Sequence, residues 1–370
     1  MLQELLRPTV FWQLLAAGLI GVVVLWWMLL GSGRFARRRA LRQRIAGLGQ
    51  LPITDSALAA LSSMRRGIGD AVQALLRPSG RPPRRALLYH VPWLMFVGDE
   101  AAAVPGLLAA AHHACARPAP PARESMAPDT FWRWWSLGPL TAIEVDADAV
   151  CPPEATRERG LWYQALLELA ERRERLPLNG VVVCMSASAL LGAAEEIDET
   201  AMQLRRLVDE ASQLLLLRLP VYLVVTGLEQ LRGHRTVLAA LPPAVLAQAL
   251  GHRLPLNESM GSAGSRFDQL FAEIVDRLRA LRMGLARSRP SAAERLAIHG
   301  FVEDMTALQP NLRLLAERLF DGSRRIDEPT LHWRGLYFTG TAEDGAPAAF
   351  VEDLFQRLLP ADQPLARPLR

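Results

Sequence analysis

The sequence contains no lysine, so all 42 of its Lys+Arg positions are arginines. A phosphate-binding P-loop ends in Gly-Lys-Ser/Thr, and its lysine reaches the β- and γ-phosphates of the nucleotide. The base-reading loop of GTPases also depends on a lysine. Neither motif can be complete in this chain, which excludes ordinary P-loop catalysis.

Cysteine is also scarce. Cys115, Cys151 and Cys184 are scattered, odd in number and without metal-ligand spacing, which is typical of reduced thiols in a reducing compartment. The sequence also lacks a Gly-x-Ser-x-Gly elbow, a His-Glu-x-x-His motif and a Cys-x-x-Cys pair. We therefore assign no catalytic residue and no metal site, and we expect that the protein is not an enzyme.

One long apolar run stands near the start of the chain. Residues 10–30 are interrupted only by Gln13, and as a helix they would span about 31 Å, the thickness of a bilayer core. A signal peptide would have a shorter apolar core and a small-residue cleavage site. We predict a transmembrane anchor over residues 1–33.

Six arginines follow this run, against Arg7 alone before it: Arg34, Arg37, Arg38, Arg39, Arg42 and Arg44. The positive-inside rule then places everything after residue 33 in the cytoplasm. Nucleic-acid binding is the alternative interpretation of the cluster. We favour contact with the lipid bilayer and expect no nucleic acid partner, because the cluster has no interleaved aromatics and lies where anionic lipid attracts it.

Apolar runs alternate with helical patterns through the middle of the chain. Such alternation predicts an α/β fold with a parallel, doubly wound sheet and right-handed crossovers. The expected strands are 93–97, 140–145, 180–185 and 221–225, and the expected helices are 101–114, 156–175 and 197–217.

The segments around this pattern complete the predicted organisation. A basic juxtamembrane helical or linker segment occupies 34–84, the α/β domain 85–256, a helical region 257–330, and a returning strand, C-terminal helix and tail 331–370. We expect the strand at 332–339 to return to the edge of the sheet. The aromatic run Phe131-Trp132-Arg133-Trp134-Trp135 predicts a hydrophobic cover over the sheet, with an exposed interaction patch as the alternative.

The turn after the first predicted strand stands where a phosphate would sit on helix amides. Gly98 fits the start of a phosphate-binding loop, and we assign it to a vestigial nucleotide site. Asp99 and Glu100 then place carboxylates where phosphates would lie and would repel them. We interpret these two residues as acids that stabilise the start of the next helix. The second glycine, the lysine and the Mg²⁺-binding hydroxyl of a P-loop are missing.

Two further strand ends depart from a nucleotide-binding pattern in the same way. Asp146 follows the second strand, at the place of a Walker B aspartate, and is the other vestigial nucleotide-binding residue. Its alternative role is a solvated strand end or a helix cap. The segment Thr226-Gly227-Leu228-Glu229 lacks the lysine and aspartate of a base-reading loop. Three such departures predict a degenerate P-loop NTPase-like domain without a cofactor.

Several motifs, in this order, resemble the N-terminal cytoplasmic region of the IcmF/TssM family, the inner-membrane component of type VI secretion systems. The motifs are Pro92-Trp93 leading into the P-loop position, Trp134-Trp135, Pro177-Leu178-Asn179-Gly180-Val181, Leu219-Pro220-Val221-Tyr222, Arg334-Gly335-Leu336-Tyr337-Phe338-Thr339 and Asp353-Leu354-Phe355. Together they cover about residues 85–360.

The single apolar run and its arginines predict a single-pass protein whose C-terminal domain lies in the cytoplasm, and the resemblance implies that its membrane is the bacterial inner membrane. The resemblance also implies a type VI secretion scaffold that docks DotU/TssL-like inner-membrane proteins or baseplate proteins. Because the nucleotide motifs are degenerate, we expect its pseudo-GTPase domain to be catalytically inactive. The alternatives are a regulator that still binds nucleotide weakly through Gly98, Asp146 and an arginine, and a membrane-surface adaptor acting through the arginine cluster. Because the sequence ends at Arg370, we do not expect it to bridge the two membranes as full-length family members do.

Overall fold

The computed structural model describes residues 8–47, 62–63, 65–69, 73, 88–115, 132–151, 156–255, 261–289, 291–321, 331–341 and 348–369. Its centre is a seven-stranded sheet in the order β2-β3-β1-β4-β6-β8-β7. The strands are β1 (Trp93–Gly98), β2 (Trp132–Ser136), β3 (Thr141–Asp146), β4 (Gly180–Ser186), β6 (Pro220–Thr226), β7 (Leu250–Arg253) and β8 (His332–Phe338). The five central strands are parallel, and β2 and β7 are antiparallel edge strands.

The central strands are buried on both faces, which explains their continuous apolar runs. Along β1, Trp93, Met95 and Val97 pack into one core, and Leu94 and Phe96 into a second core. Alternate side chains of a strand point to opposite faces, so each core lies on one side of the sheet. The result is an α/β fold of three layers, and the α/β prediction is confirmed.

Helices cover both faces of the sheet. Side chains of α6 (Thr156–Arg172), α8 (Ala194–Leu214) and α13 (Gln309–Phe320) pack with the Trp93 side of β1. Side chains of α4 (Val104–Cys115) and of the π-helical turn η5 (Leu354–Leu358) pack with its Leu94 side. In α8 the buried positions Ile197, Ala201, Leu204, Val208 and Ala211 recur every three or four residues, so one stripe of the helix faces the core.

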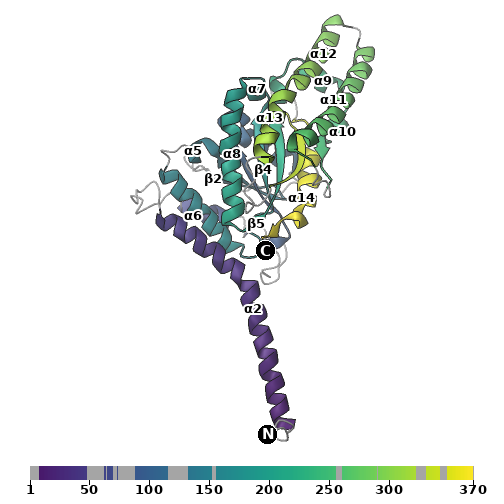
Figure 1. Ribbon diagram of the computed structural model, residues 1–370. Coiled ribbons are helices and arrows are strands. Elements are labelled where there is room, and N and C mark those ends of the chain that lie inside the picture. Colours follow the sequence, from purple (N-terminus) through teal and green to yellow (C-terminus); the bar gives the residue numbers. More distant parts are fainter. Residues whose placement is uncertain are drawn as a thin grey trace.

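The remaining elements are short, apart from a helical hairpin. The short ones are η3 (Glu100–Ala102), α5 (Ala147–Val150), α7 (Ala187–Leu190), η4 (Leu228–Gln230), α9 (His234–Ala240), α10 (Pro243–Leu246), α14 (Leu359–Ala361), η6 (Gln363–Leu365) and the two-stranded pair β5 (Leu217–Arg218) and β9 (Arg367–Pro368). The hairpin consists of α11 (Ala263–Ser288) and α12 (Ala292–Ala307), and it projects from one end of the body (Figure 1).

The chain begins with one 40-residue helix, α2 (Pro8–Gly47). Its N-terminal part projects away from the body, and its C-terminal part lies along α6 (Figure 1). No helix in the described ranges combines the length and the apolar character that crossing a membrane requires. The structure therefore does not confirm the anchor predicted near residues 10–30.

Three edge features differ from the sequence-based expectation. The tryptophan run does not lie over the sheet but forms β2, an edge strand of it, with Trp134 in edge-to-face contact with Trp93 at 5.2 Å between ring centroids. The strand at 332–338 does return to the sheet, but it is not at the edge, because β7 pairs with its outer side. We did not predict β7, whose four residues are only half-buried and include a glycine and two basic side chains.

Candidate functional site

The carboxyl ends of the parallel strands meet at one edge of the sheet, where α/β proteins bind their ligands. Gly98 at the end of β1 is in register with Asp146 at the end of β3 and with Cys184 in β4. The two residues assigned to a vestigial nucleotide site are thus neighbours. Gly98 is buried and Asp146 is exposed.

The turn after β1 is closed by its own side chain. Asp99 is the N-cap of η3, and its carboxylate accepts a hydrogen bond of 2.9 Å from the amide of Ala102. The amide of Ala103 donates to the carbonyl of Glu100 at 3.1 Å. These amides occupy the place of a phosphate cradle, but they are directed to partners inside the turn. Asp99 therefore caps the short helix η3, as the sequence predicted for an acid at a helix start.

The first turn of α4 offers few amides to a ligand. Pro105 is its second residue and has no N–H. The amides of Gly106 and Leu107 both donate to the carbonyl of Ala103, at 2.9 and 3.3 Å. A helix start binds an anion through unpaired N–H groups, and those of Gly106 and Leu107 are already paired.

The space beside Gly98 is filled by protein. A Cβ atom at this position would lie 3.0 Å from the Ala102 Cβ, from the Cys184 carbonyl oxygen and from a Val104 methyl group. In a phosphate-binding loop, glycine lets the backbone approach the ligand. Here it lets the strand approach η3 and α4, so Gly98 has a packing role.

Polar side chains at the ends of β4 and β6 hold neighbouring turns in the same way. The hydroxyl of Thr226 donates to the carbonyl of Ala102 at 2.7 Å, which ties the end of β6 to η3. The hydroxyl of Ser186 accepts from the amide of Ala189 at 3.0 Å and caps α7. Both side chains are buried. Each therefore serves the packing of this edge.

Glu229 occupies the position where a base-reading loop would need an aspartate. Its carboxylate accepts from the amide of Thr341 at 3.0 Å and from the Thr341 hydroxyl. Glu229 thus holds the loop that follows β8. His234 lies close by, beside Gly340. Burial lowers the pKa of His234, and the negative charge of Glu229 partly opposes this shift. The imidazole is therefore neutral at pH 7.

Within the described ranges, no three His, Cys, Asp or Glu side chains are placed to hold a metal ion together. The arrangement at the carboxyl edge of the sheet is a set of intramolecular hydrogen bonds between turns.

A second polar cluster, which sequence reasoning missed, lies nearer the start of β8. The buried carboxylate of Asp362 accepts from the Tyr222 hydroxyl at 2.9 Å, from Arg334 Nε at 2.9 Å and from Arg253. Burial, followed by the charge of Asp362, raises the pKa of the Tyr222 hydroxyl. Arg334 belongs to the Arg-Gly-x-Tyr-Phe-Thr motif, so this motif fastens the C-terminal segment to the sheet.

Comparisons with known proteins identify the family of the chain. The chain belongs to the IcmF/TssM family, since its residues 155–370 match the IcmF-related N-terminal domain. It is similar to the type VI secretion system component TssM1 of Pseudomonas aeruginosa strain PAO1, with 24% identity over 294 residues. That match covers 78% of this chain but 26% of TssM1, so the chain spans about a quarter of the length of this relative. No solved structure matches the chain. The family resemblance predicted from the sequence is confirmed.

Proposed function

We propose that the protein is a catalytically inactive, membrane-attached scaffold of a type VI secretion system. Its α/β domain would keep the fold of a P-loop NTPase but lack the nucleotide-binding site. It would act as a pseudo-GTPase that docks other components of the secretion system. Family membership and the similarity to TssM1 support the assignment to type VI secretion.

One observation carries the proposal of inactivity. The amide of Ala102, at the place of a phosphate cradle, is capped by Asp99, while its carbonyl is held by Thr226. A phosphate that bound this amide would displace the Asp99 carboxylate and would lie beside two carboxylates, while the bond from Thr226 fixes the position of the turn. A lost hydrogen bond that leaves a buried group unpaired costs about 1–3 kcal/mol. The absence of lysine removes the cation that would offset this cost.

Membrane attachment is the second part of the proposal. Trp12, Leu15, Leu19, Ile20 and Val22 are large apolar residues with exposed fractions between 48% and 64%. They lie on the projecting part of α2, which Figure 1 shows apart from the folded body. Apolar side chains left uncovered by the protein favour insertion into lipid. The arginines that follow orient the α/β domain toward the cytoplasm of a bacterium, beneath its inner membrane.

The hairpin α11–α12 is the surface that we propose for docking a partner protein. Met283 near the end of α11 and Leu296 near the start of α12 are 52% and 70% exposed. Gly284 lies in the interior of α11 with open space around it. An exposed glycine weakens a helix by about 1 kcal/mol relative to alanine. No contact in the described chain requires it, so close approach of a partner is a reason to keep it. DotU/TssL-like inner-membrane proteins and baseplate proteins are the expected partners.

Crosslinking in cells tests the scaffold. The tagged full chain would be crosslinked in its host, purified from membranes and analysed by mass spectrometry beside a variant carrying Met283→Asp and Leu296→Asp. We expect type VI secretion components to be enriched by the wild type and reduced with the variant. Recovery of the chain without any secretion component contradicts the proposal.

The register of Gly98 and Asp146 favours the alternative function, a weak nucleotide-binding regulator. Calorimetric titration of the purified chain with GTP and ATP in the presence of Mg²⁺ separates the two functions. We expect no binding at micromolar concentrations. Micromolar affinity that is lost on Asp146→Ala would establish the regulator and overturn the inactive scaffold.

A further inference from the structure

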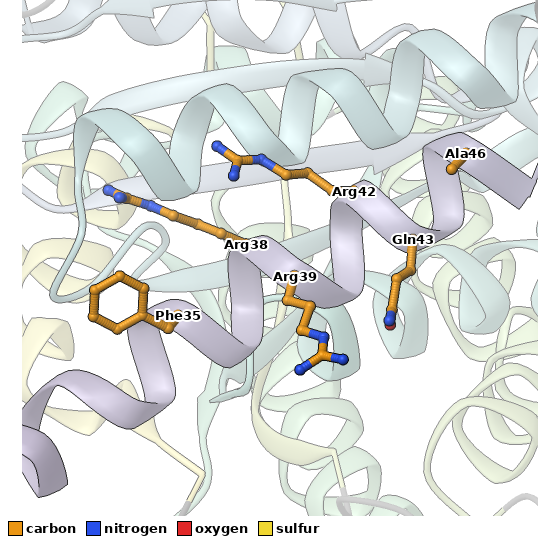
Figure 2. Close-up of a pocket in the computed structure, with 6 residues that line it drawn as sticks. All are labelled: Phe35, Arg38, Arg39, Arg42, Gln43 and Ala46. Carbon is orange, nitrogen blue, oxygen red and sulfur yellow. The ribbon is translucent and has the colours of Figure 1, made fainter.

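The arginines that follow the apolar run of α2 point in different directions. Arg38 pairs with the Glu174 carboxylate at 2.8 Å, and Arg42 pairs with Glu171 at 3.1 Å, both on the α6 side. Arg39 is exposed and makes no ion pair with any described residue. Figure 2 shows Arg39 and Gln43 directed to the opposite side of α2 from Arg38 and Arg42. The basic cluster is thus divided between a contact with the domain and an open face.

A shallow groove runs along this part of the helix. Its volume is about 510 Å³, and it is lined by Phe35, Arg38, Arg39, Arg42, Gln43 and Ala46. The lining contains three guanidinium groups, an amide and an aromatic ring, but no carboxylate. Phe35 is 67% exposed at the end of the groove nearest the N-terminus. An aromatic ring beside cations suits a surface where apolar chains meet phosphate groups.

The geometry of the helix sets the depth of the groove relative to a bilayer. If residues 10–30 span the hydrocarbon core, a rise of 1.5 Å per residue places Phe35 about 7.5 Å beyond it, in the headgroup layer. Arg39 follows at about 13 Å, and side chains on a helix lean back toward its N-terminus. The guanidinium group then lies within one Debye length, about 8 Å, of the lipid phosphates.

We propose that this groove binds the phosphate headgroups of anionic lipids such as phosphatidylglycerol. The inference rests on the membrane attachment proposed above and adds the lipid class that the attached helix selects. Arg39 provides the unpaired charge, and Phe35 anchors the helix in the headgroup layer.

An acidic stripe at the C-terminal end of α6 supports this arrangement. It consists of Glu168 and Glu171 on the helix and Glu174 two residues after its end, and an anionic membrane would repel all three. Each is paired with an arginine from the N-terminal segment, namely Arg65, Arg42 and Arg38. These pairs neutralise the stripe and hold the groove against a rigid helix, which leaves Arg39 to face the lipid.

Native mass spectrometry of the full chain in nanodiscs tests the inference. The nanodiscs would contain equal amounts of phosphatidylcholine and phosphatidylglycerol, and the lipids that stay on the released protein would be counted. We expect the wild type to retain phosphatidylglycerol preferentially. One arginine near a membrane surface accounts for about a fivefold preference, so Arg39→Ala should lower the preference about fivefold, Arg39→Glu should abolish it and Arg39→Lys should keep it.

Arg287→Glu is the matched control, because Arg287 is an exposed arginine at the end of α11, away from the groove. Equal retention of both lipids by the wild type, or the same loss in Arg287→Glu as in Arg39→Glu, overturns the lipid-binding groove. Failure of the wild type to enter nanodiscs of either lipid is a different result. It overturns the membrane attachment, and the groove with it.

Discussion

The hydroxyl of Thr226 donates a hydrogen bond to the carbonyl of Ala102, which lies 124 positions earlier in the chain. The donor stands at the end of β6 and the acceptor in the turn after β1, with β4 between these two strands. The bond therefore crosses the carboxyl edge of the sheet, where α/β proteins bind their ligands.

Replacing this threonine should weaken the fold without exposing a nucleotide site. Thr226→Val keeps the shape of the side chain and leaves the buried carbonyl without its donor, so we expect a loss of about 1–3 kcal/mol in the free energy of unfolding. Urea unfolding of the purified full chain measures it. Thr200→Val is the control, because Thr200 donates to Glu196 on the exposed surface of α8. Its change should stay within about 0.5 kcal/mol. Equal losses for the two variants would show that the Thr226 hydrogen bond contributes no more to stability than an exposed one.

Two glycine-to-alanine changes should have opposite effects on the stability of the fold. At Gly98 the new methyl group would meet the Cys184 carbonyl oxygen, the Ala102 Cβ and a Val104 methyl group at 3.0 Å each, and we expect a destabilisation of about 1–3 kcal/mol. At Gly284 nothing lies within 4 Å, and the better helix propensity of alanine should stabilise the chain by up to about 1 kcal/mol. Thermal unfolding of both variants checks this pair. A stable Gly98→Ala would mean that η3 and α4 can move away from β1.

Acid should weaken the contact between α12 and the segment before α9. Asp304 of α12 accepts hydrogen bonds from the backbone amide and the guanidinium group of Arg232. These bonds hold the pKa of the Asp304 carboxyl below its ordinary value of 3.8. The unfolded chain then takes up this proton more readily than the folded chain does. The stabilisation is therefore complete above about pH 5 and is lost as the pH falls through the folded pKa.

Asp304→Asn removes the dependence of this contact on pH. We expect this variant to be less stable than the wild type at pH 7 by about 1 kcal/mol, and the difference to shrink toward pH 3. Urea midpoints of both proteins at the two pH values measure it. A difference that stays constant between pH 7 and pH 3 would contradict the role of the ionised carboxylate.

Neutralising the acidic stripe of α6 should release α2 without unfolding the domain. In a variant with Glu168, Glu171 and Glu174 changed to glutamine, the ion pairs with the N-terminal segment are lost. Exposed ion pairs each contribute about 0–1 kcal/mol, so global stability should change little. Hydrogen exchange of residues 35–47 should become faster. The control changes Glu273, Asp276 and Glu303 on the hairpin to amides. Among the described residues these pair with Arg277, Arg279, Arg282 and His299 of the hairpin and with His252 of β7, and with no residue of α2. Faster exchange in the control as well would point to a general loss of stability.

Much of the fold could be predicted from local pattern. The central strands β1, β4 and β6 are continuous apolar runs because both of their faces are covered, and the predicted strands agree with them to within about two residues. The edge strands are harder to predict from the sequence. In β2, Arg133 interrupts three tryptophans, and in β7 the sequence Leu250-Gly251-His252-Arg253 has no apolar run, because an edge strand is only partly buried.

The site could be predicted only in part. Parallel strands end at one edge, so the proximity of Gly98 and Asp146 follows from the topology. The hydrogen bonds from Thr226 to Ala102 and from Thr341 to Glu229 join positions more than 100 residues apart. No local periodicity reports such a contact. The same is true of Asp362, whose partners Tyr222, Arg253 and Arg334 come from three different strands.

The position of β8 has a consequence for the way the protein is made. This strand lies inside the sheet, between β6 and β7, although it is translated after every other strand of that sheet. Until it leaves the ribosome, β6 presents an open edge and β7 has no neighbour. One edge of the apolar strand β6 therefore stays unpaired while the α11–α13 helices are synthesised, although its other edge can pair with β4. An open apolar edge of this kind is prone to aggregate, so the order of synthesis exposes the chain to aggregation until β8 is in place.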